Sequence, residues 1–334
     1  MNFSVAITTY NRPVHLDKLV RQLLRCSVVP TTVLVIDSSE VTNEEIQKID
    51  QVKYIRSSHK NQPYQRYLGY LSCKTEIIIF LDDDLEIIDF TVFDVMLSRL
   101  KQPGIKGISV GFEHHHTISQ ILDSKVDGQS LIFRVINFLS GVPVLKPGKI
   151  YMAGLAGPRP TEEGPVDYFN GAVMGFYRAE LTSLFNPVLF SLFERKLGMG
   201  EDKVITMAVG LTSTLWFNPH HFFVHPPVSS NYFQDVESFQ RKVMYSRLFV
   251  SLEYGRLRHY PRVLIYLHYY YFAGWRLFIA GLRAILKPGS QRSATARGIF
   301  QGVLLTFTLP FEVQKITPQI DWQRDATSDI QAGA

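Results

Sequence analysis

The sequence predicts an α/β fold in which a mostly parallel sheet is covered by helices on both faces. Two observations support this prediction. Short apolar runs alternate with helical patterns over residues 3–81, and each run is apolar at consecutive positions, which is typical of strands buried on both faces. The chain has 334 residues, of which 46% are hydrophobic and 19% are charged. It is therefore long enough to bury a sizeable core and too poor in charge to be disordered.

The periodicity of the first part of the chain assigns its strands and helices in order. Residues 3–8 form an apolar strand, and five apolar residues then recur at the spacing of one helix face, namely Leu16, Leu19, Val20, Leu23 and Leu24. Asn11 and Pro13 mark the start of this helix, because Asn can cap a helix and Pro is tolerated in its first turn. The pattern that follows predicts strands over 32–36, 52–55, 76–81 and 106–112 and a helix over 65–73.

The basic residues gather in the C-terminal part of the chain. Residues 241–300 hold eleven Lys or Arg and a single acid, Glu253, a local balance of +10 in a chain whose net charge is +5. We therefore expect a domain over 1–235 and a basic, aromatic-rich helical extension over 236–334. Met1 leads directly into a strand without a secretory leader, and Cys26 and Cys73 fit no metal or redox spacing. Both features predict a cytoplasmic protein with two buried, reduced thiols.

Polar residues follow the predicted strands, at the edge of the sheet where ligands of α/β proteins bind. Residues 9–12 follow the first strand, Asp37 follows the second, and the consecutive acids Asp82, Asp83 and Asp84 follow the fourth. The two-residue period of a strand predicts that Asp82 and Asp84 point to one side and Asp83 to the other. The sequence contains neither G-x-G-x-x-G nor G-x-x-x-x-G-K-[ST]. A dinucleotide fingerprint and a P-loop are thus both absent.

The three aspartates are open to two interpretations. Crowded carboxylates repel one another unless a cation offsets their charge, and Mg²⁺ or Mn²⁺ takes one or two carboxylate ligands while keeping positions for phosphate oxygens. This interpretation predicts a site for a metal ion and a diphosphate. The other interpretation is an acidic turn that caps the next helix, because helical periodicity follows Leu85. The aspartates by themselves do not decide between the two.

Several short motifs follow one another in the order found in an enzyme family. Thr8-Thr-Tyr-Asn-Arg-Pro13, Val35-Ile-Asp-Ser-Ser39 and Phe80-Leu-Asp-Asp-Asp84 resemble family 2 glycosyltransferases of the GT-A fold, and among these the rhamnosyltransferase-like members. Tyr168-Phe-Asn-Gly-Ala-Val-Met-Gly-Phe-Tyr-Arg178 is similar to the acceptor-side strand of that family, and Gly200-Glu-Asp-Lys-Val-Ile-Thr-Met-Ala208 to its Glu-Asp motif. The resemblance covers most of residues 1–235, which would then be the GT-A catalytic domain.

The resemblance implies a role for each matching residue. The implied donor-binding residues are Thr8, Thr9, Tyr10, Arg12, Asp37, Arg66, Asp82 and Asp83. Asp84 and His225 are the implied ligands of Mg²⁺ or Mn²⁺, and Asp202 is the implied base for the acceptor hydroxyl, with Asn170, Gly171 and Glu201 on the acceptor side. Two alternatives stay open, because an acid at a helix start such as Asp202 can serve as a cap, and a His beside prolines such as His225 can be a loop residue.

Residues 263–286 form a nearly apolar segment that is long enough to raise a transmembrane interpretation. Arg276 and Arg283 argue against it, because placing arginines in hydrocarbon is costly, and Tyr269, Tyr270, Tyr271 and Trp275 are residue types that favour the headgroup layer. We therefore expect a helix that lies on an anionic membrane surface, joined by residues 299–311. A helix packed on the rest of the chain and an unusual span are the alternatives. No nucleic-acid partner is expected, since no recognisable nucleic-acid module accompanies the basic region.

Together these features predict an inverting, metal-dependent glycosyltransferase, peripheral on the cytoplasmic face of the membrane. It would move a sugar from a nucleoside-diphosphate sugar to an acceptor hydroxyl on a glycan, a lipid-linked precursor or a cell-surface precursor. Two other classes of protein remain as alternatives. One is a nucleotide-sugar binding or scaffolding protein without turnover, and the other is a nucleotidyltransferase on a similar sheet.

Overall fold

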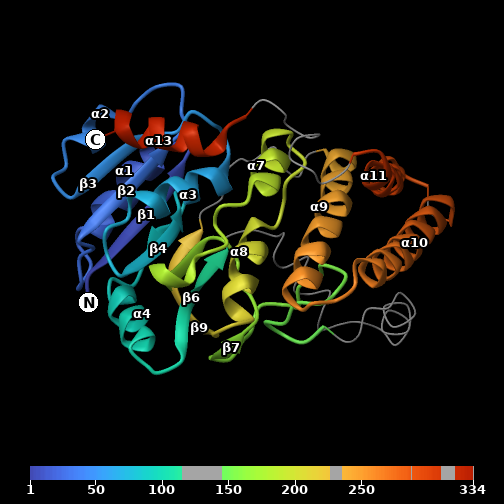
Figure 1. Cartoon of the computed structure of the whole chain (residues 1–334), viewed down its shortest axis with the longest axis horizontal. Helices are drawn as coiled ribbons and strands as arrows, with labels where there is room; N and C mark the ends of the chain where they lie inside the picture. Colours follow the sequence, from blue (N-terminus) through green and yellow to red (C-terminus); the bar gives the residue numbers. More distant parts are fainter. Residues whose placement is uncertain (115–144, 226–234, 287, 310–319, 334) are drawn as a thin grey trace.

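The fold is built on one nine-stranded mixed sheet, shown in Figure 1. The structure is a computed structural model, and it describes residues 1–114, 145–225, 235–286, 288–309 and 320–333. Within these residues the strand order is β3-β2-β1-β4-β8-β6-β9-β5, and β7 pairs with β9. The mostly parallel sheet flanked by helices that the sequence predicts is therefore confirmed.

The N-terminal half of the sheet is entirely parallel. It consists of β1 (Phe3–Thr9), β2 (Thr32–Asp37), β3 (Val52–Arg56) and β4 (Ile77–Asp82). All four strands were expected from apolar runs, and the structure extends each by one residue at its carboxyl end. Thr8 lies opposite Asp82 and Thr9 lies opposite Asp37 in the register of the sheet. The polar residues that end these strands are thus brought to one edge.

The other half of the sheet introduces antiparallel pairs. It contains β5 (Glu86–Ile87), β6 (Ile105–His114), β7 (Gly164–Val166), β8 (Val173–Tyr177) and β9 (Thr214–His225). Strand β8 runs antiparallel to β4, whereas β9 runs parallel to β6. Strand β9 continues to His225 beside β5, so this histidine ends a strand, and the interpretation of His225 as a loop residue is wrong.

Helices cover both faces of the sheet. They are α1 (Pro13–Leu23), α2 (Glu44–Gln47), α3 (Gln62–Ser72), α4 (Val92–Leu100), the short 3₁₀ helix η1 (Arg178–Glu180), α7 (Pro187–Glu194) and α8 (Glu201–Gly210). Helix α1 begins at Pro13 as expected, but no side chain caps it, so the predicted cap by Asn11 is wrong.

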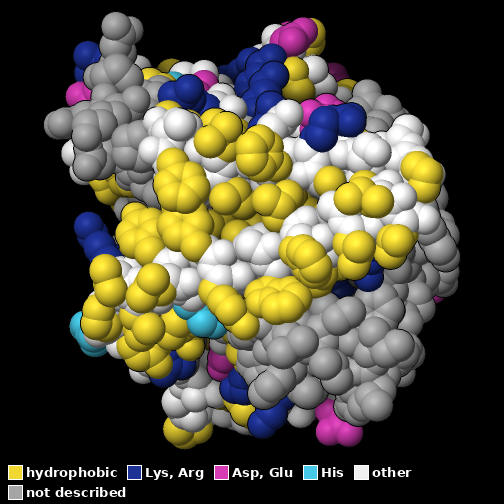
Figure 2. All heavy atoms as spheres, turned by 90° about the vertical axis from the view of Figure 1, so that its right-hand side faces the viewer, with side chains coloured by type: hydrophobic (Ala, Val, Ile, Leu, Met, Phe, Trp, Pro, Cys, Tyr) yellow, Lys and Arg dark blue, Asp and Glu magenta, His cyan; other side chains and the backbone are white. Residues whose placement is uncertain are grey.

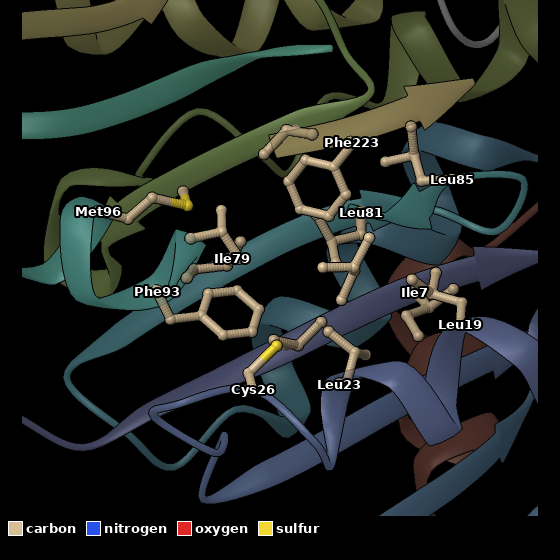
Figure 3. Close-up of a cluster of buried hydrophobic side chains, with 14 of the residues drawn as sticks. Ile7, Leu19, Leu23, Cys26, Ile79, Leu81, Leu85, Phe93, Met96 and Phe223 are labelled. Atoms are coloured by element: carbon tan, nitrogen blue, oxygen red, sulfur yellow. The ribbon is translucent and has the colours of Figure 1, made fainter. Parts of the chain in front are cut away.

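Alternate residues of the strands point into two separate hydrophobic cores, one on each face of the sheet. On one face, Ile7, Ile79 and Leu81 meet Leu19 and Leu23 of α1 together with side chains of α4, as Figure 3 shows. On the other face, the neighbouring strand positions pack against α3, α7, α8 and a C-terminal helix. Consecutive strand residues point to opposite faces, and here both faces are covered. This explains why the strands are apolar throughout. The two cysteines are free and buried, as predicted.

Four helices form the C-terminal part of the described chain. They are α9 (Val236–Leu257), α10 (Arg262–Leu286), α11 (Ser290–Thr308) and α13 (Trp322–Ala332). Helices α9, α10 and α11 pack together at one end of the molecule, and α9 contacts α8. Helix α13 returns to the sheet, where it packs against β3 and α3 (Figure 1). Searched over the described residues, the chain has no helix that is long and apolar enough to cross a membrane.

Candidate active site

The turn after β1 places Arg12 at the edge of the sheet where the parallel strands end. Asn11 adopts a left-handed conformation, with φ of 53°, which Asn tolerates better than most residues. Its backbone N–H donates to the hydroxyl of Ser39 at 2.6 Å, and its side-chain oxygen accepts from the N–H of Glu40 at 3.2 Å. These contacts tie the turn to the segment after β2, so that Arg12 faces the carboxyl end of β4.

Arg12 joins two of the three aspartates. Its Nη1 donates to Asp83 Oδ1 at 2.8 Å and to Asp84 Oδ2 at 2.6 Å, and the Thr9 hydroxyl donates to Asp83 Oδ2 at 2.7 Å. Asp82 instead pairs with Arg66. The prediction that Asp82 and Asp84 share one side is therefore wrong. The two-residue alternation holds only inside a strand, and β4 ends at Asp82, so the next two residues follow the geometry of a turn.

Asp84 and His225 face each other across the site. Asp84 Oδ1 lies 3.2 Å from His225 Nε2, yet no donor in the described part of the chain forms a well-aligned hydrogen bond with this buried oxygen. Burial acts to raise the pKa of Asp84, but His225 and Arg12 outweigh it and lower that pKa. A carboxylate oxygen and an imidazole nitrogen aimed at each other are suitable ligands for Mn²⁺ or Mg²⁺.

The protein ligands available for a metal ion are few. No group of three or more His, Cys, Asp or Glu within the described ranges is arranged as a complete metal site. Asp84 and His225 fit a site in which a substrate supplies the remaining ligands, as is common for Mg²⁺ bound to phosphates.

Arg66 lies at the centre of a second polar cluster, which contains Asp82, Glu201 and Gly171. Its side chain on α3 is almost fully buried, and it donates to Asp82 Oδ1 at 3.1 Å, to Glu201 Oε1 at 2.9 Å and to the carbonyl oxygen of Gly171 at 3.0 Å. Burial raises the pKa of Asp82 to about 7, although Arg66 opposes that shift, and burial also raises the pKa of Glu201. The single guanidinium therefore offsets two carboxylates that desolvation disfavours.

Asp202 lies where β8 and α8 approach each other. Its Oδ2 accepts from the N–H of Gly171 at 3.1 Å, and its Oδ1 accepts from the N–H of Lys203 at 2.8 Å. The space at Gly171 is tight, because a Cβ there would lie 3.1 Å from Nη2 of Arg66 and 3.3 Å from Cβ of Asp202. Asn170, the preceding residue, is half-buried. The Glu201–Asp202 pair and the Asn170–Gly171 pair are thus brought together.

A cavity of about 700 Å³ lies beside the aspartates and contains Asp37. Thr9, Asn11 and Ser39 line it together with residues 40–45. Asp37 accepts hydrogen bonds from the N–H of Ser39 at 2.7 Å, from the Tyr54 hydroxyl and from Arg56 at 3.4 Å. Because Thr9 both lines this cavity and donates to Asp83, the cavity adjoins the aspartate cluster.

Two of the predicted site residues lie at the margins of this arrangement. Thr8 is buried in the sheet beside Asp82. Tyr10 is exposed, and its hydroxyl accepts from Nζ of Lys60 at 2.9 Å. Among the described hydrogen bonds, neither side chain bonds any of the three aspartates.

Sequence reasoning missed several polar residues that support the site. Gln62 donates to Asp82 at 3.1 Å, and the buried Gln65 donates to the carbonyl oxygens of Thr9 and Ile36 at 3.0 and 2.8 Å. Gln65 therefore ties the ends of β1 and β2 together. Gln62 precedes Arg66 by one helical turn, so the spacing i, i+4 on α3 was a signal that could have found it.

One family model covers the part of the chain that holds the aspartates. Residues 4–117 match Glycosyl transferase family 2. The family 2 match contains Asp37, Arg66 and all three aspartates, and it ends before Asp202 and His225.

Solved structures extend the likeness of fold to the whole chain. Crystal structures of S. aureus TarS 1-349 are similar at a TM-score of 0.52 with 13% identity, covering 99% of this chain and 92% of that one. The same fragment in complex with UDP-GlcNAc gives a TM-score of 0.51 with 12% identity, covering 99% and 89%. At such identity the likeness shows a GT-A-like fold alone. No curated protein matches the chain. The family 2 match and this fold together support a glycosyltransferase.

Proposed function

We propose that the chain is an inverting, metal-dependent glycosyltransferase that moves a sugar from a nucleoside-diphosphate sugar to an acceptor hydroxyl. The observation that carries the proposal is the continuity of the edge of the sheet. The Asp37 cavity, the Asp84–His225 pair and the Arg66 cluster follow one another along it, linked by Thr9 and by the run of aspartates. A nucleoside, a diphosphate and a sugar need three adjoining environments of this kind.

The cavity around Asp37 suits the nucleoside part of the donor. Asp37 is buried and offers carboxylate oxygens to a base or ribose hydroxyl, while Tyr54 and Arg56 hold it in place. Arg12 bonds two of the aspartates and directly follows Asn11, which lines this cavity, and its side chain is 32% exposed. It is thus the cation best placed to meet a diphosphate. That TarS 1-349 forms a complex with UDP-GlcNAc is consistent with this donor class.

Asp84 and His225 would hold the divalent metal ion. Arg12 already bonds Asp84 Oδ2, so Oδ1, which faces His225, is the oxygen available to ligate. A bound Mg²⁺ or Mn²⁺ would offset the charge that develops on the departing diphosphate. Asp84 and His225 would position the metal ion. Because Arg12 already bonds Asp84 Oδ2, that oxygen would not hold a second cation.

Asp202 is our proposed base for the acceptor hydroxyl. Two backbone N–H groups, those of Gly171 and Lys203, donate to its carboxylate, and these hydrogen bonds fix its orientation. A base that takes the acceptor proton on the face opposite to the leaving diphosphate would produce inversion. The acceptor would be a glycan or a lipid-linked or cell-surface precursor. The rhamnosyltransferase-like character stays a prediction that the donor screen below addresses.

The first experiment is a thermal-shift screen of UDP, GDP, dTDP and CMP sugars, each with and without Mn²⁺ or Mg²⁺. Selective binding to the folded protein raises its melting temperature. We expect a metal-dependent rise for one donor, lost in Asp84→Asn and kept in the matched control Asp50→Asn, whose exposed carboxylate lies outside the site. An equal shift with and without metal would contradict the metal site. No shift with any nucleotide sugar would contradict the donor class.

A further inference from the structure

Helix α10 is apolar on two opposite sides, which is unusual for a helix at the edge of a molecule. Its inner side is buried against α9 and α11 through Ile265, Tyr269, Phe272, Ala273 and Ala280. The hydroxyl of Tyr269 donates to the carbonyl oxygen of Met244 on α9 at 2.7 Å. The inner side thus has the contacts that hold α10 on the protein, and the outer side is not needed for that purpose.

The outer side carries large apolar side chains that are exposed in the described structure. Together with α11 it presents a continuous surface, visible as the broad band of hydrophobic side chains in Figure 2. We call this the outer apolar face, and it consists of Val263 (69% exposed), Leu267 (66%), Tyr271 (52%), Phe278 (60%), Leu282 (43%), Ile285 (78%), Phe300 (54%), Leu304 (49%) and Phe307 (67%). Contiguous exposed apolar surface of this kind marks an interaction site on a folded protein.

The two helices that carry the outer apolar face are basic. Residues 254–311 contain eight Lys or Arg and no Asp or Glu. Arg262 at the start of α10 is exposed, and it forms no ion pair with a carboxylate in the described part of the chain. Arg262 and Phe307 line a cavity of about 690 Å³ at the turn between α9 and α10, together with Arg256 and Glu253, which pair with each other. Basic and apolar groups therefore lie side by side at this cavity, where an anionic and amphipathic partner would satisfy both.

We propose that the outer apolar face docks on an anionic lipid bilayer, with α10 and α11 lying along its surface. A bilayer offers acyl chains to the apolar side chains and negative headgroups to the arginines. Tyr271 and Trp275 belong to the residue types that favour the headgroup layer. A second copy of the chain fits less well, because a two-fold contact would bring the same basic helices against each other. This inference goes beyond the proposed transfer activity and does not depend on it.

The test is co-sedimentation of the full chain with vesicles of phosphatidylcholine alone and of phosphatidylcholine mixed with phosphatidylglycerol. We expect binding to the mixed vesicles that weakens as salt is added. Leu267→Ser combined with Phe278→Ser should lower the vesicle-bound partition coefficient by about tenfold or more, because each side chain loses its burial in the bilayer. The matched control is Val14→Ser with Val29→Ser, which removes exposed apolar side chains of the N-terminal part and should bind as the wild type does.

A charge-changing variant and its control test the electrostatic contribution to vesicle binding separately. Arg262→Glu should lose about tenfold or more of its binding to mixed vesicles, since it removes one basic residue that contributes about 1 kcal/mol near an anionic surface and adds an acid there. Lys74→Glu makes the same charge change at an exposed site of the N-terminal part and should have little effect.

Four results would overturn the proposal. They are no binding to mixed vesicles, equal binding to neutral and mixed vesicles, equal loss in the variants and their controls, and a dimer that Leu267→Ser with Phe278→Ser converts to a monomer without any vesicle binding. The last result would assign the face to a second copy. Nucleotide-sugar thermal shifts on the same variants keep this outcome separate from the donor site, because the substituted residues lie outside it.

Discussion

Replacing Arg66 by leucine should destabilise the protein strongly, and the size of the effect can be worked out from its contacts. Arg66 is 1% exposed, and its guanidinium bonds Asp82 and Glu201. Removing one partner of a buried ion pair costs about 3–5 kcal/mol, because it leaves an uncompensated charge. The side chain of Asp82 keeps 26% exposure while that of Glu201 keeps 12%, so water can relieve part of the penalty at Asp82. We therefore expect a loss of about 3 kcal/mol in the free energy of unfolding at neutral pH.

The loss of stability in Arg66→Leu should increase as the pH rises. Arg66 lowers the pKa of both carboxylates against a desolvation that raises them. Without Arg66 the folded-state values rise further above those of the unfolded chain. A group with a raised folded pKa stabilises the protein when protonated and loses that contribution as pH increases. Arg66→Leu should therefore be least destabilised near about pH 5 and most destabilised near about pH 8.

Urea unfolding followed by circular dichroism at these two pH values is the assay. Arg21→Leu is the control, because Arg21 pairs with Asp17 on the exposed side of α1 and its loss should change the unfolding midpoint little at either pH. If Arg66→Leu unfolds at the wild-type urea concentration at both pH values, then Arg66 does not offset these carboxylates and the account of the cluster is wrong.

Three further predictions address other parts of the chain. Asp202→Asn should keep metal-dependent donor binding in calorimetry while transfer falls by about 10²–10⁴-fold; full transfer would leave Asp202 only a capping role. Trp322→Ala should cost about 3–5 kcal/mol of unfolding free energy in urea titrations, because Trp322 is 3% exposed, whereas loss of Trp275, which is only partly buried, should cost less. His59 lies between carboxylates of α7 and α13, which outweigh burial and raise its pKa. His59→Gln should therefore cost stability below about pH 6.5 and progressively less above it, and a cost that grows with pH would contradict this contact.

Much of the sheet could be predicted because its signal is local. The apolar runs that became β1, β2, β3 and β4 were readable from consecutive residues, since strands buried on both faces need no partner to be recognised. The strand order could not be read in this way. That β8 rather than β6 lies beside β4 depends on how the whole chain packs its two cores.

The sequence also could not predict that the site divides into one cluster around Arg12 and another around Arg66. The aspartates were evident as a run, but the pattern assumed that the strand continued through them. The end of β4 at Asp82 instead turned Asp83 and Asp84 toward Arg12. Local periodicity stops where a turn begins, so the direction of each carboxylate had to come from its tertiary contacts.

The sequence by itself determined the α/β character, the edge of the sheet where polar residues collect and the basic charge of the C-terminal part. Only the tertiary structure decided which charges meet. Arg66 and Glu201 are 135 residues apart in the chain, and Asp329 near the C terminus accepts hydrogen bonds from Ser58 and Tyr64. Short-range patterns follow from backbone geometry, which repeats every two or 3.6 residues. Pairings over such separations depend on which elements become neighbours when the cores are buried, and no local pattern encodes that.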